Sequence, residues 1–228
     1  MNSPASASPE ADEGVIKFAL EFNRAGPQGW EAIAELNAWR QLLFRLGLTG
    51  RDPARYGGLA YGNVSRRAGG RRFIVSGTRT GAKPCLAPAD YCLVLDFDLA
   101  KNFLRAEGPV EPSSEALTHG AVYDAVPQAG CVIHAHSPEI WRNARPLGIR
   151  LTAADIAYGT PAMGVAVGEA AAGCAAGVVA MGGHEDGVLA FAGQPGQAAG
   201  CLLQCLAKAL ELELRAQVLD GKLDGQAG

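Results

Sequence analysis

The sequence predicts a single α/β domain, and three observations support this prediction. Its 228 residues suffice for one large domain or two small ones, and one compact core is the favoured outcome. Apolar residues recur at helical spacing near both ends of the chain. Between these ends, short apolar runs are separated by glycine and proline, as is typical of strands joined by turns. We expect the domain to span residues 10–228.

The N-terminal region is predicted to form a tail and two helices. Residues 1–9 are small, polar and proline-containing, so we expect them to be disordered. A first helix is predicted from Glu10 to Gly26, where apolar side chains recur at helical spacing. A second helix is predicted over residues 30–46, because a broad apolar face ends at Gly47. The spacing of the first helix is carried by Val15, Phe18, Ala19 and Phe22.

Short strands and helices are predicted for the rest of the chain. Residues 59–67 and 71–78 are expected to form a hairpin, because a glycine-rich connection joins them. The other expected elements are strands at 91–95, 102–106, 178–183 and 188–192, helices at 108–127, 138–145, 169–177 and 195–220, and a loop leading into an extended run at 158–167.

The charge balance excludes some classes of partner. The 20 basic and 23 acidic residues give a net charge of −3, which argues against a protein that coats nucleic acid or a membrane surface. Ten of the basic residues lie between Arg40 and Lys83, where Asp52 is the only acid. This region is expected to face an anionic ligand or an acidic neighbouring subunit, or else to be a solvated or structural basic face.

Cysteine usage and hydropathy predict a cytoplasmic protein. The six cysteines form no CxxC pair and mostly lie among apolar residues, which favours reduced thiols over disulfides. No basic segment followed by a long apolar run begins the chain, and no stretch approaches about 20 uninterrupted apolar residues. Neither secretion nor membrane insertion is therefore expected.

The stretch AGCVIHAHSPEIW, residues 129–141, has the pattern of a metal-binding strand. Successive side chains of a strand point to opposite faces, so His134 and His136 share one face. The other face is apolar and can anchor the strand in a core, while Ser137-Pro138 is predicted to begin a helix. The alternative is that both histidines are ordinary core or surface residues.

A third ligand has few candidates, because the chain has only four histidines. His184 directly follows the predicted strand at 178–183, and it can approach the other two only if the strands are neighbours. His119 lies on the predicted helix at 108–127, where packing is the favoured interpretation.

The start of this helix offers a carboxylate and two hydroxyl groups. Ser113 is predicted to be the N-cap, and Glu115 then falls in the first turn, where a negative charge is favourable. In the functional interpretation, Ser113, Ser114 and the free amides bind an anion while Glu115 points toward the histidine strand. Gly62-Asn63 and Ser76-Gly77, near strand ends, are further candidates for anion binding, with ordinary turn chemistry as the alternative.

In their order along the chain, these motifs resemble those of the class II aldolase/adducin family. They are GNVS (62–65), SG (76–77), PSSE (112–115), HAHS (134–137) and GHEDG (183–187). The resemblance covers roughly residues 10–220. It implies a three-layer α/β/α domain with a mainly antiparallel central sheet, commonly a homotetramer with active sites near subunit contacts.

The resemblance also implies roles for individual residues. His134, His136 and His184 would hold a divalent metal, usually Zn²⁺, with Mn²⁺ or Co²⁺ as alternatives. Glu115 matches the catalytic carboxylate. The phosphate-binding positions match Gly62, Asn63, Ser76, Gly77, Ser113 and Ser114.

The function expected from the resemblance is that of a metal-dependent, fuculose-phosphate aldolase-like lyase of carbohydrate metabolism. Its substrate would be a small hydroxy-carbonyl or sugar compound, phosphorylated or not. A sugar-phosphate epimerase or dehydratase with the same metal site is one alternative, and a non-catalytic adducin-like oligomeric module is another. The GHEDG segment departs from the simpler His-Gly of the sugar-phosphate aldolases, so Glu185 or Asp186 is expected to orient a ligand imidazole or to contact substrate. Tyr158 is the nearest candidate for a further catalytic residue, although a structural role is the more common one for such a tyrosine.

Overall fold

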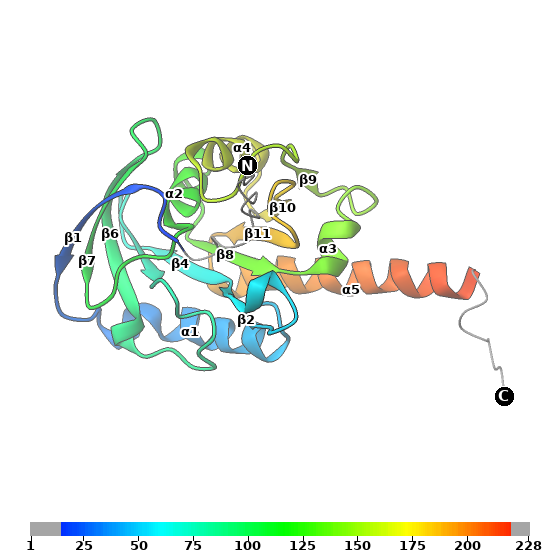
Figure 1. Ribbon diagram of the computed structural model, residues 1–228, viewed down its shortest axis with the longest axis horizontal. Coiled ribbons are helices and arrows are strands. Elements are labelled where there is room, and N and C mark those ends of the chain that lie inside the picture. Colours follow the sequence, from blue (N-terminus) through cyan, green and yellow to red (C-terminus); the bar gives the residue numbers. More distant parts are fainter. Residues whose placement is uncertain (1–14, 220–228) are drawn as a thin grey trace, which may run out of the picture.

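A nine-stranded sheet with helices on both faces dominates the structure, a computed structural model that describes residues 15–219 (Figure 1). The predicted tail at residues 1–9 lies outside the described residues. The strands are β1 (Ala19–Arg24), β2 (Gly50–Arg51), β3 (Ala60–Tyr61), β4 (Asn63–Arg67), β5 (Phe73–Ser76), β6 (Tyr91–Asp98), β7 (Phe103–Gly108), β8 (Cys131–His136), β9 (Arg150–Leu151), β10 (Gly177–Ala180) and β11 (Gly187–Ala192). The helices are α1 (Trp30–Arg45), α2 (Ala116–Ala125), α3 (Pro138–Arg142), α4 (Pro161–Ala171) and α5 (Pro195–Leu219).

The main sheet is mixed, which corrects the expectation of a mainly antiparallel sheet. Its strand order is β1-β7-β6-β5-β4-β8-β11-β10-β9. The pairs at both edges, β1 with β7 and β9 with β10, are parallel, whereas the pairs between them are antiparallel. At the β9 edge the reason is connectivity: α4 lies between β9 and β10, and such a crossover returns the chain in the same direction.

The first predicted helix is wrong, because Ala19–Arg24 forms the edge strand β1. Its sequence also has a period of two: Leu20 and Phe22 pack against the core while the residues between them are exposed. The apolar residues of this short segment fit both a helical repeat and a strand repeat. Pairing with the free edge of β7 selects the strand.

The extended run predicted at 158–167 is also wrong, because Pro161–Ala171 forms helix α4. The Thr160 hydroxyl caps this helix by accepting from the Met163 amide at 3.2 Å, and Pro161 occupies its first position. Two glycines lower the helix propensity but allow close packing: a Cβ on Gly164 would lie 2.7 Å from a Leu99 methyl group. Tertiary packing of α4 against α2 therefore decides the conformation.

The helix predicted at 169–177 is also wrong, because α4 ends at Ala171 and strand β10 begins at Gly177. The other predicted elements agree more closely with the structure. Helices α1 and α5 confirm the predictions at 30–46 and 195–220, and β4 and β5 form the predicted hairpin, with β3 pairing separately with β2. All six cysteines are free thiols. Within residues 15–219, no helix has the length and apolar character needed to cross a bilayer.

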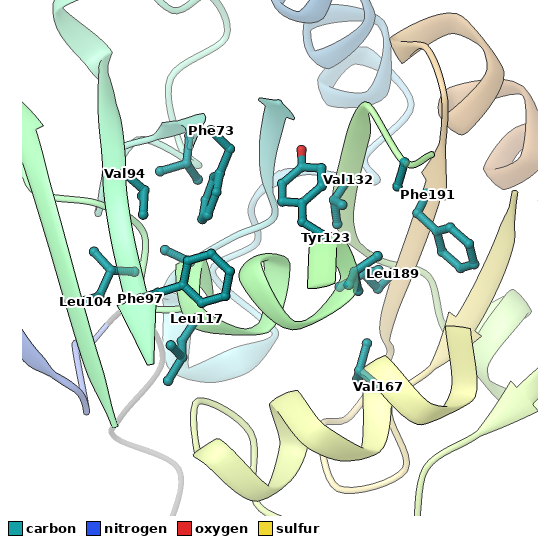
Figure 2. Close-up of a cluster of buried hydrophobic side chains, with 14 of the residues drawn as sticks. Phe73, Val94, Phe97, Leu104, Leu117, Tyr123, Val132, Val167, Leu189 and Phe191 are labelled. Carbon is teal, nitrogen blue, oxygen red and sulfur yellow. The ribbon is translucent and has the colours of Figure 1, made fainter. Parts of the chain in front are cut away.

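Two hydrophobic clusters lie on opposite faces of the sheet. Along β8, Ile133 belongs to the cluster that includes side chains of α1, α3 and α5, whereas Val132 belongs to the cluster under α2 and α4 (Figure 2). Aromatic rings of Phe73, Phe97 and Tyr123 pack together in the second cluster, with centroids 5.1 to 5.9 Å apart. The even-numbered residues of β8, including both histidines, therefore face the side of the sheet that carries α2.

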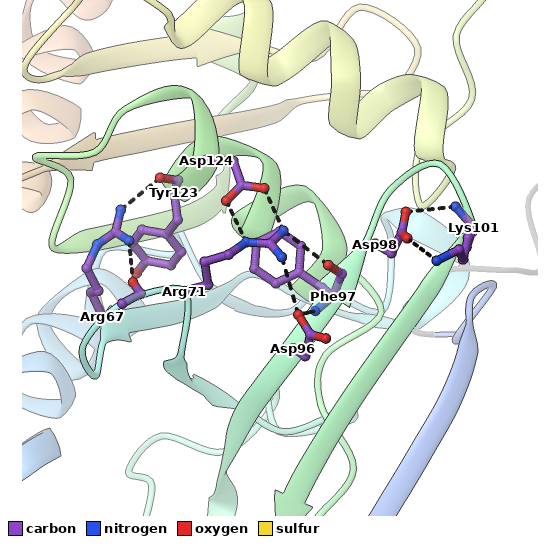
Figure 3. Close-up of polar contacts among 9 residues, drawn as sticks. Arg67, Arg71, Asp96, Phe97, Asp98, Lys101, Tyr123 and Asp124 are labelled. Carbon is purple, nitrogen blue, oxygen red and sulfur yellow. Dashed lines mark hydrogen bonds and ion pairs between the residues drawn. The ribbon is translucent and has the colours of Figure 1, made fainter.

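Arginines of the β4–β5 hairpin connect the sheet to the end of α2 (Figure 3). Arg67 donates to the carbonyl oxygens of Ala129 and Tyr123, both at 2.8 Å. Arg71 pairs with Asp124 at 2.8 Å and with Asp96 at 3.3 Å. Part of the basic region found in the sequence thus has a structural role.

Candidate active site

Strand β8 holds two imidazoles at the centre of the sheet. It lies between β4 and β11, so that Asn63 is opposite His134 and Gly187 is opposite His136. Both histidines are 2% exposed and, as predicted, share one face of the strand. Because β8 is hydrogen-bonded on both edges, the positions of these side chains are fixed by the sheet.

His184 joins the pair because β11 and β8 are neighbours. It lies in the turn between β10 and β11, three residues before the strand position that pairs with His136. The Nε2 atom of His184 is 3.0 Å from Nε2 of His136 and 3.3 Å from Nε2 of His134. Three imidazole nitrogens from two parts of the chain therefore converge.

The turn that carries His184 depends on two preceding glycines. A Cβ on Gly183 would lie 1.8 Å from the Ile156 carbonyl oxygen, and one on Gly182 would lie 2.2 Å from that of Thr152. These contacts are with backbone atoms, so the neighbours cannot move aside as a flexible side chain can. The GG before His184 therefore lets this turn pack against the 152–156 segment.

We expect Gly183→Ala to destabilise the protein by about 3 kcal/mol, because the added methyl group overlaps a backbone carbonyl. Chemical denaturation measures this change. Gly200→Ala is the matched control, because its Cβ would meet nothing within 4 Å in helix α5, and it should raise stability by up to about 1 kcal/mol. Equal midpoints for the two variants would contradict the packing argument.

Burial and hydrogen bonding prepare the imidazoles for a metal ion. Burial lowers the pKa of His136 to about 3, and burial together with the adjacent imidazoles lowers the pKa of His184 well below its usual range. Both rings are therefore neutral at pH 7, with a nitrogen lone pair available. Nδ1 of His134 donates to the Val188 carbonyl oxygen at 3.2 Å, which leaves its Nε2 as the acceptor atom facing the cluster.

The spacing of the nitrogens also fits a metal. Within the described part of the chain, these three histidines form the one group of side chains whose ligand atoms, all within 4.8 Å of one another, could hold an ion. Tetrahedral bonds of about 2.0–2.1 Å to zinc place two nitrogens about 3.3 Å apart. The observed separations of 3.0 and 3.3 Å are close to this value.

Two tyrosines pack against the histidines: Tyr158, which the sequence offered as a candidate site residue, and Tyr56, which it did not. The Tyr56 ring lies edge-on to His136 with centroids 4.5 Å apart, and the Tyr158 ring lies 4.3 Å from that of His184. The Tyr56 hydroxyl donates to Asp186 at 2.6 Å, and both residues have positive φ values, 50° and 60°. Burial and this hydrogen bond raise the pKa of Tyr56. Asp186 belongs to the GHEDG motif, but Tyr56 carries no signal in the sequence.

Glu115 lies at the start of α2 and lines a cleft together with His134 and His184. The structure makes Glu115 the N-cap residue, which corrects the assignment of Ser113, whose hydroxyl instead accepts from the Glu115 amide at 3.3 Å. The Glu115 carboxylate is 5% exposed and accepts from the Thr118 hydroxyl at 2.9 Å. A buried carboxylate oriented by a neighbouring hydroxyl is suited to proton transfer.

A cleft connects the histidines to the predicted anion-binding residues. It is lined by His134, His184, Glu115 and Tyr158, and by Gly62, Asn63, Gly77, Ser113 and Ser114. Ser76 does not line it, because its hydroxyl accepts from the Val64 amide at 3.1 Å in the interior. The loop 77–81 adds Thr78, Arg79 and Thr80, which no sequence motif had singled out.

Asn63 is the clearest polar group prepared for a ligand. Its side chain is 7% exposed, and its Oδ1 atom has no hydrogen-bond partner among residues 15–219. An unpaired buried acceptor is costly, so a ligand hydroxyl group that donates to Oδ1 would recover this cost.

His119 lies apart from the three converging nitrogens. It is fully buried on α2, and its Nδ1 is 2.7 Å from the Ser65 hydroxyl, which is 2.8 Å from the hydroxyl of Tyr123. Burial lowers the pKa of His119 to about 3. These contacts agree with the packing role expected for it.

The sequence of this chain matches a known protein family and two related enzymes. Residues 54–214 match the family model described as the class II aldolase and adducin N-terminal domain. An 83-residue stretch is 44% identical to methylthioribulose-1-phosphate dehydratase of Pseudomonas savastanoi pv. phaseolicola, covering 36% of this chain and 34% of that protein. The same enzyme of Xanthomonas euvesicatoria pv. vesicatoria is 44% identical over 46 residues, covering 20% of this chain and 19% of that one. The matches therefore span about a third and a fifth of these curated relatives.

Solved structures share the fold at low sequence identity. Fuculose-1-phosphate aldolase of Thermus thermophilus superposes with a TM-score of 0.62 at 21% identity, covering 88% of this chain and 100% of that one. A sugar-phosphate aldolase of Thermotoga maritima gives a TM-score of 0.65 at 17% identity, covering 83% and 96% of the two chains.

Proposed function

Because this chain belongs to the class II aldolase and adducin family, we propose that it is a metal-dependent lyase that acts on a small phosphorylated hydroxy-carbonyl compound. The observation that carries the proposal is the convergence of three buried imidazoles beside a cleft that is also lined by a buried carboxylate and several small polar residues. Aldolase-type cleavage of a carbon–carbon bond is the leading reaction.

His134, His136 and His184 would hold the metal. Three neutral nitrogen ligands leave a divalent ion with its full charge and with open positions, as catalytic rather than structural sites require. When bound, the ion would act as a Lewis acid that polarises a substrate carbonyl group. Zn²⁺ is the favoured ion, because imidazole is one of its common ligands, and Mn²⁺ and Co²⁺ are the alternatives.

Glu115 would move the proton. Its carboxylate lines the cleft together with His134 and His184, so a substrate seated at the histidines lies within its reach. The Thr118 hydroxyl holds one carboxylate oxygen, Oε2. We expect the carboxylate to accept a proton from a carbon or a hydroxyl group of the substrate and later to return it.

Small polar residues of the same cleft would hold a phosphate group. Asn63 and Ser114 contribute side chains there, and Gly62 and Gly77 contribute backbone without obstructing it. Neither glycine tolerates a side chain: a Cβ would lie 2.6 Å from Thr49 at Gly62 and 2.5 Å from Val110 at Gly77.

We expect the double variant Asn63→Ala/Ser114→Ala to bind inorganic phosphate at least about tenfold more weakly, because two hydrogen bonds to a charged group are lost. Competition of phosphate with turnover, or calorimetry on the metal-loaded protein, measures the change. Ser3→Ala/Ser8→Ala, far along the sequence from every cleft residue, is the control. Unchanged affinity in the cleft variant would remove these residues from the phosphate site.

A dehydratase is the second candidate, favoured by the 44% identity over 83 residues to methylthioribulose-1-phosphate dehydratase. Both reactions need a polarised carbonyl and a base, and they differ in the bond that breaks next. A screen of the metal-loaded protein against phosphorylated and unphosphorylated hydroxy-carbonyl compounds separates them. Aldol cleavage releases an aldehyde, dehydration releases water, and epimerisation changes only stereochemistry.

The non-catalytic adducin-like module is the third possibility. It gives no reason to bury three imidazoles and a carboxylate around one cleft. Metal analysis of the purified protein tests it, because we expect about one divalent ion per chain. No stoichiometric metal after loading would favour the module. A homotetramer remains our expectation for the assembly, and light scattering measures it.

A further inference from the structure

We propose that Arg40 is a positioning residue for the binding of a phosphate monoester. It orders the loop 77–81, called the cleft loop below, and places a positive charge next to it. The inference rests on the proposed function, because the cleft loop forms part of the candidate active site. Arg40 itself does not line the cleft.

Arg40 lies on α1 and is directed into the protein, with only 2% of its side chain exposed. Its guanidinium donates to the carbonyl oxygens of Gly81 at 2.7 Å and Thr80 at 3.3 Å, and also to that of Lys83. One planar group thus holds two carbonyls at the C-terminal end of the cleft loop and a third just beyond it. The fork geometry of arginine makes this possible, whereas a lysine ammonium has no equivalent.

The charge of Arg40 has no carboxylate partner within 4 Å in the described part of the chain. Asp90, whose charge influences the pKa of Arg40, is paired with Lys83 instead. Burying a cation without an opposite charge is costly, and carbonyl dipoles compensate only part of that cost. A bound anion in the adjacent cleft would complete the compensation.

The cleft loop is arranged to receive such an anion. Arg79 has a φ of 59°, a conformation that turns successive amides toward one side of a chain. The amides of Arg79, Thr80 and Gly81 have no acceptor among residues 15–219, while two of the carbonyls in this segment point to Arg40. The exposed side chain of Arg79 adds a second positive charge at the cleft.

This arrangement favours a phosphate monoester over a carboxylate. A phosphate offers three oxygens and a charge near −2, which can use the amides and the field of Arg40 together, whereas a carboxylate offers two oxygens and one charge. Of the ten basic residues between Arg40 and Lys83, two hairpin arginines, Arg67 and Arg71, are thus structural, whereas Arg40 and Arg79 serve the cleft.

The test measures binding of inorganic phosphate, methyl phosphate and acetate to the metal-loaded protein by calorimetry. We expect Arg40→Met to weaken the binding of both phosphates by about tenfold or more, because a charge near the anion is lost. The binding of acetate should weaken less. Arg40→Lys keeps the charge but not the three-carbonyl fork, and should weaken phosphate by about threefold.

Asn37→Ala is the matched control. Asn37 is buried on the same face of α1 and donates to the Leu86 carbonyl at 2.7 Å, outside the cleft loop. Its phosphate affinity should stay within about twofold of wild type at a similar loss of stability. Wild-type phosphate affinity in folded Arg40→Met overturns the inference, and so does wild-type affinity in Arg40→Lys if the Met variant does not fold.

Metal content and turnover of the wild type, measured on the same preparations, test the proposed function separately. Arg40-dependent phosphate binding in a protein without metal or turnover would reject the proposed function and support this inference. Metal-dependent turnover together with a phosphate affinity that does not depend on Arg40 would support the proposed function and reject this inference.

Discussion

Glu115→Gln is expected to lower turnover by roughly 10²–10⁴-fold while metal content and oligomer mass stay unchanged. The amide occupies the same space but cannot exchange a proton, which is the effect expected for an acid/base residue. Glu115 lines one cleft together with His134 and His184 and is 5% exposed, so water is a poor substitute for its carboxylate. Measuring kcat, metal stoichiometry and mass on one preparation provides the test.

The alternative role of Glu115 is structural. As the N-cap of α2 it faces the positive end of the helix dipole, and losing that interaction would cost about 0.3–1 kcal/mol with little effect on activity. Asp124→Asn is the matched control, because it makes the same chemical change at the other end of α2, where Asp124 pairs with Arg71 at the surface. Wild-type kcat in Glu115→Gln would return this residue to a structural role, and loss of metal would make it a ligand.

His184→Ala is expected to reduce the bound metal from about one ion per chain to a small fraction, with loss of turnover, because a site of three nitrogen ligands becomes a site of two. His119→Ala is the control. It removes a buried imidazole that contacts Ser65 on a neighbouring element but does not belong to the converging group. Metal analysis after dialysis, together with a thermal melt with and without added Zn²⁺, measures both variants.

The two histidine variants separate metal binding from general damage to the core. His119→Ala should melt at a lower temperature yet retain stabilisation by Zn²⁺, since binding to the folded state alone raises stability. His184→Ala should lose that stabilisation. Comparable metal loss in both variants, or in neither, would refute the ligand set.

Local patterns in the sequence were enough to predict much of the site. The spacing of His134 and His136 places them on one face of a strand whatever its neighbours are, because the strand repeat is two residues. The Ser-Ser-Glu start of α2 and the glycines near strand ends are likewise local signals. At Ala19–Arg24 and Pro161–Ala171 the local pattern was compatible with both a helix and a strand. The element that each segment packs against decided between them, and the prediction failed at both.

What the sequence determined by itself is the set of chemical groups: two imidazoles on one strand face, a carboxylate at a helix start, and small polar residues at strand ends. Only the tertiary structure decided which of them meet. Pairing of β11 with β8 brings His184 to 3.0 Å from His136 across 48 positions of sequence, and no local pattern encodes that pairing. The contributions of Tyr56 and Arg40 are non-local in the same sense. Packing of distant elements directs these side chains to His136 and to the cleft loop, because burial and hydrogen bonding depend on which surfaces meet in the fold.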